Sequence, residues 1–126
     1  MPKHVPDLPG IEAGPYPFSQ VVEANGFVFL AGQVGDAPGS HGVVRGGIEA
    51  ETRAMLENVG RLLDAVGLSY ADVVKCTVYL RDFGDFGAMN KVYREFFPQD
   101  APTRATVGVT ALAADYSVEI EVMATR

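Results

Sequence analysis

The sequence predicts an α+β domain with a largely antiparallel sheet and two helices packed on one face of it. Stretches of strand length alternate apolar and polar residues, two longer segments carry apolar residues at helical spacing, and Asn25-Gly26 is a strong hairpin signal. The predicted order is strand, strand, helix, strand, helix, strand, strand. With 126 residues, 48% of them hydrophobic, the chain can bury one core, and we expect residues 1–126 to form a single domain.

The first third of the chain is predicted to contain an irregular N-terminal segment followed by a β-hairpin. Residues 1–17 are rich in proline, so we expect them to be irregular or extended. Residues 18–23 and 27–31 read as strands on either side of Asn25-Gly26. The glycine-rich residues 34–47 are predicted to be a loop that includes, at most, a short strand at 43–44.

The remaining elements follow from hydrophobic spacing. A helix is predicted over 48–66, with Gly67 as its C-terminal cap, because its apolar positions form one stripe: Ile48, Thr52, Met55, Val59, Leu62 and Val66. Residues 73–80 form the next predicted strand. A second helix is predicted over 86–97 and ends before Pro98. Residues 102–109 and 118–124 alternate as two final strands.

Composition restricts the possible partners. The net charge is −6, and the ten Lys and Arg residues are scattered, so we expect neither a nucleic-acid nor an anionic-membrane partner. No apolar run reaches membrane-spanning length and the N-terminus has no signal-peptide core, so a cytoplasmic protein is expected. Cys76 is the single cysteine, and its spacing from His4 and His41 does not resemble a metal site; it is predicted to be a small core residue.

The last two strands carry the most informative charges. In 102–109, Arg104 and Thr106 alternate with the set predicted to face the core: Ala105, Val107 and Val109. In 118–124, Glu119 and Glu121 face away from the core. If these strands pair antiparallel, one sheet face carries an arginine, which suits a carboxylate ligand, and a glutamate that can handle protons. Ordinary surface charges on a solvated sheet explain the same pattern.

The sheet face without helices is predicted to be mixed in character. We expect it to include Phe18, Phe27 or Val28, Thr77, Tyr79, Thr106 and the two glutamates. A face this apolar indicates contact with another subunit. The alternative is a monomer in which this face of the sheet is exposed to solvent.

A set of short motifs, in order and spacing, resembles the RidA/YjgF family of reactive-intermediate deaminases. The resemblance runs from about residue 14 to the C-terminus and is carried by Pro17-Phe18-Ser19-Gln20, Ala31-Gly32-Gln33, Asp85-Phe86, Asn90, Tyr93, Phe96-Phe97, Pro102-Thr103-Arg104 and Val118-Glu119-Ile120-Glu121. It implies a chorismate-mutase-like fold and a homotrimer whose sheets line a central barrel, with sites in the clefts between subunits. It also implies hydrolysis of 2-imino and 2-enamino acids to 2-keto acids and ammonia, without cofactor or metal.

The resemblance also assigns roles to individual residues. Arg104 would clamp the substrate carboxylate, and Glu119 would position or deprotonate the attacking water. Gly32 would lend backbone groups to the site, and Asn90 would lie near the cleft. Glu121 is expected to be structural or at the interface.

Two positions depart from the family pattern. Phe18 stands where the family usually has a tyrosine that lines the site; Tyr16 aligns there only with a two-residue gap. Thr106 replaces a residue that is often cysteine in the family. Both are expected to contact substrate, and the hydroxyl missing at Phe18 favours a more apolar substrate.

Two other functions remain open on the sequence. A non-catalytic trimer that binds a small carboxylate or regulates a partner would keep Arg104 but tolerate loss of Glu119. RNA cleavage or translational inhibition is another activity ascribed to this family, but the net negative charge of the chain disfavours binding to RNA.

Overall fold

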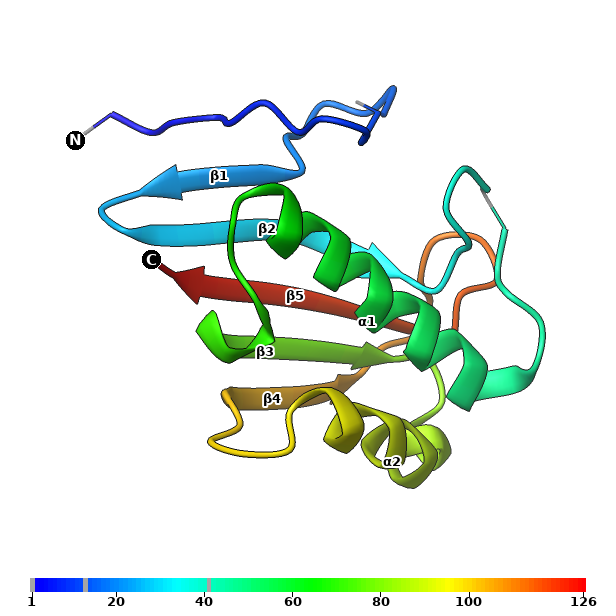
Figure 1. Ribbon diagram of the computed structural model, residues 1–126. Coiled ribbons are helices and arrows are strands. Elements are labelled where there is room, and N and C mark those ends of the chain that lie inside the picture. The colour runs from blue at the N-terminus through cyan, green and yellow to red at the C-terminus, as the bar shows by residue number, and fades with distance from the viewer. Residues whose placement is uncertain (1, 13, 41) are drawn as a thin grey trace.

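The computed structural model describes residues 2–12, 14–40 and 42–126. Its sheet is mixed, with strand order β1-β2-β5-β3-β4 (Figure 1). The strands are β1 (Val21–Ala24), β2 (Phe27–Val34), β3 (Val73–Leu80), β4 (Thr103–Gly108) and β5 (Val118–Thr125). Only the β3–β4 pair among these strands is parallel; the other three pairings are antiparallel.

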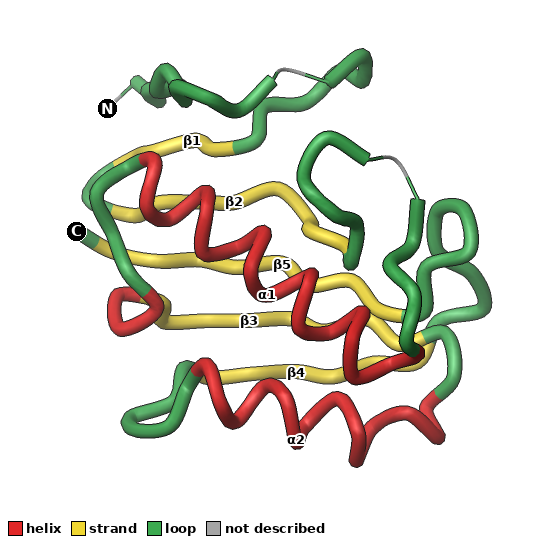
Figure 2. The backbone as a smooth tube through the Cα atoms, turned by 45° about the vertical axis from the view of Figure 1, so that its right-hand side comes forward, coloured by secondary structure: helices red, strands yellow, loops and turns green. Residues whose placement is uncertain are grey.

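Two helices cover one face of this sheet, as predicted. Helix α1 (Gly47–Ala65) crosses the sheet diagonally, and α2 (Phe86–Phe96) lies beside β4 (Figure 2). Short 3-10 turns, η1 (Tyr70–Asp72) and η2 (Phe83–Asp85), precede β3 and α2. The buried core fills the space between the helices and the inner sheet face, and includes Met55, Leu56, Leu63, Val78, Leu80, Met89 and Ile120.

Local signals in the sequence placed the turns correctly. Asn25 and Gly26 have φ values of 53° and 81°, the two positive angles that a tight type I′ hairpin requires. Gly67, with φ 77°, follows α1. The Gly67 and Leu68 amides donate to the Asp64 and Leu63 carbonyls at 3.0 and 2.9 Å, a Schellman cap that ends the helix.

The predicted pairing of the last two strands is wrong. Strand β5 does not pair with β4; it lies between β2 and β3 and is antiparallel to both. Strand β4 instead pairs parallel with β3, in register from Lys75 opposite Thr103 to Leu80 opposite Gly108. Helix α2 explains this arrangement, because parallel neighbours need a long crossover rather than a hairpin loop.

The predicted orientation of β4 is also wrong. Arg104 and Thr106 face the helices and are half-buried, whereas Ala105 and Val107 are exposed on the open face. Register explains the reversal: Arg104 lies opposite Cys76, which is fully buried beneath the helices, and paired residues share a face. Aromatic side chains of α2 cover this edge strand, and a guanidinium packs well on aromatic faces.

The open face is otherwise mixed, as predicted. Phe27 lies on it with 42% of its surface exposed, while Val28 is fully buried. Thr77 and Tyr79 are half-buried, and Glu121 is exposed. Thr106 does not belong to this face.

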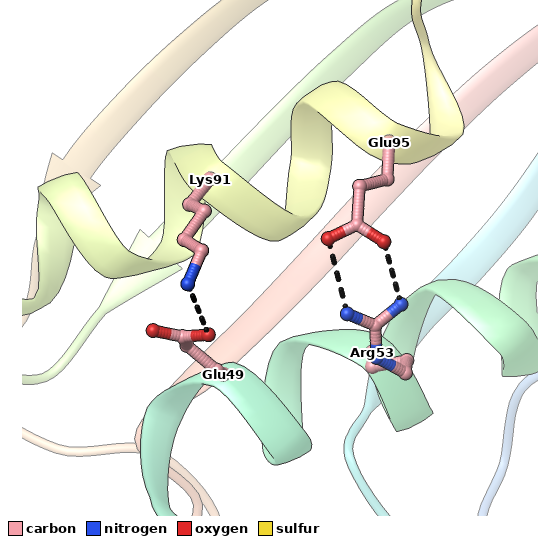
Figure 3. Close-up of polar contacts among 4 residues, drawn as sticks. All are labelled: Glu49, Arg53, Lys91 and Glu95. Carbon is pink, nitrogen blue, oxygen red and sulfur yellow. Dashed lines mark hydrogen bonds and ion pairs between the residues drawn. The ribbon is translucent and has the colours of Figure 1, made fainter.

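Ion pairs join the two helices on their outer surfaces (Figure 3). The Arg53 guanidinium donates to both carboxylate oxygens of Glu95 at 3.0 and 3.1 Å. Lys91 Nζ lies 3.2 Å from Glu49 Oε1. These four side chains are about half or more exposed, so the ion pairs contribute little to stability. Within the described part of the chain, no helix has the length and apolarity to cross a membrane.

Candidate active site

A cavity of about 820 Å³ lies between the β2–β5 part of the sheet, the segment before β1 and the loop before β5. Its walls are mostly apolar and include Tyr16, Phe18, Val22, Phe29, Val34, Ala113, Ala114 and Tyr116. The few side chains with polar groups other than tyrosine are those of Ser19, Asp36 and Glu119. An apolar cavity with few polar groups is the usual form of a small-molecule site.

Gly32 and Glu119 meet in this cavity because the sheet is irregular there. Leu30 pairs with Val122 and Gln33 with Ile120, so Ala31 and Gly32 together oppose a single β5 residue. This is a β-bulge, a device that re-aims side chains next to active sites. A Cβ atom added to Gly32 would collide with the Glu119 carboxylate. Glycine therefore lets that carboxylate lie directly against the β2 backbone.

Polar contacts hold the bulge and the neighbouring loop in place. Gln33 Nε2 donates to Gln20 Oε1 at 3.1 Å and to the Ala31 carbonyl at 3.0 Å. The buried Asn58 of α1 donates through Nδ2 to the Val34 carbonyl at 2.7 Å and to Asp36 Oδ1 at 2.8 Å. The cavity is thus built on restrained backbone rather than on a loose loop.

The start of β5 is held by a buried carboxylate. Glu51 of α1, only 3% exposed, accepts hydrogen bonds from the Ser117 amide at 2.6 Å and the Val118 amide at 3.1 Å. These contacts fix the backbone immediately before Glu119. Sequence reasoning missed this role; the available signal was that Glu51 precedes Met55 by one helical turn and so falls on the inward face.

Glu119 has the electrostatics of a proton acceptor. Its side chain is half-buried and forms no ion pair with another described residue. Burial raises the pKa of the Glu119 carboxyl, and the negative charge of Glu121 raises it further. A carboxylate made more basic in this way is better able to take a proton from water near neutral pH.

Arg104 lies elsewhere, on the helix side of the sheet. Its guanidinium carbon is 4.6 Å from the Tyr93 ring centroid and 5.6 Å from that of Phe86. No ion pair joins it to a described residue. Asn90 is half-buried and lies on the face of α2 that carries Phe86 and Tyr93. Thr106 lies two residues after Arg104 on β4, on the same face of that strand.

The six candidate residues therefore form two separate groups within one chain. Phe18 and Gly32 lie with Glu119 at the cavity, while Asn90 and Thr106 lie with Arg104 at the β4–α2 edge. The expectation that Arg104 and Glu119 share one sheet face is wrong, because they point to opposite faces. Strand β3 also separates their two strands.

Tyr16 lines the same cavity as Phe18. The two rings are stacked, with centroids 6.4 Å apart and planes 3° apart, and both are largely exposed. The alternation of proline and aromatic residues at 15–18 was the signal for this pair. The structure thus places an aromatic hydroxyl at the cavity beside the Phe18 position that lacks one.

The remaining candidate groups have structural roles. Cys76 is fully buried, and burial raises the pKa of its thiol, which fits the predicted core residue. His41 lies outside the described residues. Among the residues that are described, no three His, Cys, Asp or Glu side chains are grouped to hold a metal.

Comparisons with known proteins place the chain in a family and match its fold. Residues 12–126 match the family model described as Endoribonuclease L-PSP. The chain is 44% identical over 108 residues to a RutC family protein of Pyrococcus horikoshii, covering 86% of each chain. It is 40% identical over 110 residues to the mouse 2-iminobutanoate/2-iminopropanoate deaminase, covering 87% of this chain and 82% of the mouse protein. The structure of E. coli TdcF with bound serine superposes with a TM-score of 0.84 at 35% identity, covering 90% of this chain and 91% of TdcF.

Proposed function

Because the chain belongs to the RidA/YjgF family, we propose that it hydrolyses 2-imino acids and their 2-enamino tautomers to 2-keto acids and ammonia. The observation that carries the proposal is the Glu119 carboxyl, which lies against Gly32 in an apolar cavity, forms no ion pair with a described residue and is made more basic by burial. Relatives about 40% identical and named for this reaction support it.

The reaction needs few protein groups. A water oxygen attacks the electrophilic imine carbon, Glu119 accepts a proton from that water, and the C=N π electrons move to nitrogen. Return of the proton to nitrogen gives an amino alcohol. Glu119 then moves the proton of the new hydroxyl group to nitrogen, so that the C=O bond forms as the C–N bond breaks, releasing ammonia and leaving a 2-keto acid. Arg104 holds the substrate carboxylate through two parallel N–H donors. No cofactor or metal is required by this scheme, since the carbon is already electrophilic.

The opposite orientations of Arg104 and Glu119 support a site shared between two chains. We infer a homotrimer in which the cavity containing Glu119 of one subunit receives Arg104 of its neighbour. Closed rings of identical subunits form through such head-to-tail contacts. The exposed Phe27 and Phe29 side chains on the open sheet face are suited to burial in this assembly.

Ammonia release from freshly generated 2-imino acids tests the proposal. We expect wild-type protein to accelerate release from substrates with short aliphatic side chains, and Glu119→Gln to abolish the acceleration. Arg104→Ala should lower kcat/KM by about 100-fold or more, the effect of losing a charge-assisted bidentate pair. Wild-type protein without activity on any imino acid would refute the proposal. Full activity in Glu119→Gln would exclude its role as the proton acceptor.

The same family name includes endoribonucleases, but the charge of this chain does not favour RNA. Sixteen Asp and Glu residues outnumber ten Lys and Arg residues. Binding to a phosphate backbone depends on clustered positive charge. A carboxylate-binding regulator without catalysis would bind 2-keto acids through Arg104 but release no ammonia in the assay.

A further inference from the structure

The environment of Arg104 is unusual for a half-buried arginine. No described acidic side chain pairs with it, and its guanidinium lies over the rings of Phe86 and Tyr93, which we call the aromatic platform. These two residues are seven apart on α2, two helical turns along one face. The ring faces attract the cation without forming hydrogen bonds to its N–H groups. No ion pair with a described residue occupies the donors of Arg104, which leaves them available to a ligand.

The platform belongs to a larger cluster of aromatic rings. The Phe83 ring stacks on Phe86 with centroids 5.1 Å apart and planes 16° apart. Tyr93 is 7% exposed and packs against Phe97 with centroids 4.8 Å apart. The Tyr93 hydroxyl is buried without a hydrogen-bond partner among the described residues. The Tyr93 ring face makes the contact with the Arg104 guanidinium, at 4.6 Å from its centroid.

We propose that Phe86 and Tyr93 are positioning residues, which fix the plane of the Arg104 guanidinium so that its bidentate edge meets the substrate carboxylate. An arginine side chain is long and flexible, and holding it by a carboxylate would consume the donors that the substrate needs. Aromatic faces restrain the same group and leave its donors free. This inference rests on the proposed function, since it assigns these rings to the carboxylate-binding half of that site.

The kinetic consequence of this role is specific. Arg104 binds the carboxylate in the ground state and in the transition state alike, so loosening it weakens both complexes equally. Such uniform loss raises KM and leaves kcat nearly unchanged. Damage to folding or assembly instead lowers the concentration of active sites, which reduces the apparent kcat at constant KM.

Phe86→Leu is the test variant, and Phe83→Leu is its matched control. Both remove one ring of the same stack, but only Phe86 is in contact with the Arg104 guanidinium. We expect Phe86→Leu to raise KM by about threefold to thirtyfold, the range of a cation–π contact, with kcat within about twofold of wild type. Phe83→Leu should keep the wild-type KM. Tyr93→Leu should also raise KM, and Tyr93→Phe, which restores the ring, should recover most of the loss.

Calorimetric titration with 2-oxobutanoate, a product-like carboxylate, separates this inference from the proposed function. The Kd should rise in Phe86→Leu by the same factor as KM. If wild-type protein hydrolyses imines but Phe86→Leu and Phe83→Leu behave alike, the positioning role is overturned while the proposed function stands. If wild-type protein binds 2-oxobutanoate without hydrolysis and only Phe86→Leu weakens binding, the platform stands and the function falls. Wild-type protein that neither hydrolyses imines nor binds 2-oxobutanoate would overturn both.

Discussion

Mixing two variants that are each nearly inactive at substrate concentrations far below KM should restore activity, because Arg104 and Glu119 of one chain point to opposite faces of its sheet. Arg104→Ala lacks the carboxylate clamp but keeps a complete cavity. Glu119→Gln lacks the proton acceptor but keeps the clamp. When the two are unfolded together and refolded at equal concentrations, some sites will combine an intact Arg104 from one chain with an intact Glu119 from another.

The recovery can be worked out from the proposed ring. A site is complete only when its Arg104 comes from a Glu119→Gln chain and its Glu119 from an Arg104→Ala chain. Each condition is met half the time in random mixing, so about one quarter of the wild-type rate should return. Loss of the contact with the aromatic platform costs about 1 kcal/mol, which leaves Arg104→Ala folded. The assay is ammonia release from 2-iminobutanoate, with light scattering to verify the trimer.

A second mixture provides the control. Wild-type protein refolded with an equal amount of the Arg104→Ala/Glu119→Gln double variant should show, relative to wild type at the same total protein concentration, about one quarter of the rate if sites are shared between chains and about half if each chain holds its own site. No recovery from the two single variants, together with one-half retention in the control, would refute the shared site. A monomer at micromolar concentration would refute it as well.

Three further predictions concern individual residues. Glu121→Gln should shift the acidic limb of the pH profile of kcat/KM to lower pH, because removing a neighbouring negative charge lowers the pKa of Glu119. An acidic limb at the same pH or at higher pH would contradict this coupling. Phe18→Tyr should leave the melting temperature unchanged and shift substrate preference toward smaller or more polar imino acids, and an identical preference profile would show that Phe18 does not contact substrate. Glu51→Ala should lower the free energy of unfolding by about 2–4 kcal/mol in urea titrations, since two backbone amides lose their acceptor. Glu57→Ala, on the exposed side of α1, should be nearly neutral. Equal effects of the two variants would argue that the Glu51 carboxylate does not hold the start of β5.

Part of the candidate site could be anticipated from sequence because it depends on local features. Gly32 and Glu119 were both expected at the site through the family resemblance, and both line the cavity. The outward direction of Glu119 followed from the alternation in β5, where Val118, Ile120 and Val122 are buried as predicted. The bulge that brings Gly32 against the carboxylate has no local signature as clear as a turn dipeptide.

The position of Arg104 could not be obtained in this way. Alternation shows that a strand has two faces, but only its neighbours decide which face is inward. Ala105 and Val107 resemble core residues, yet they lie exposed because β4 is an edge strand whose other face is covered by α2. The helical spacing of Phe86 and Tyr93 indicates that they share one face of the helix, but not that this face covers Arg104.

The sequence by itself thus determined the elements, the hairpin and the cap, because hydrogen bonding and side-chain spacing within a few residues decide these. Tertiary structure alone decided that β5 lies between β2 and β3, since strand pairing joins segments far apart in the chain. That placement puts Glu119 against the bulge of β2, and the crossover through α2 puts Arg104 on the opposite face. Two residues fifteen positions apart in sequence are thereby separated, and in our proposal a second copy of the chain supplies the missing half of the site.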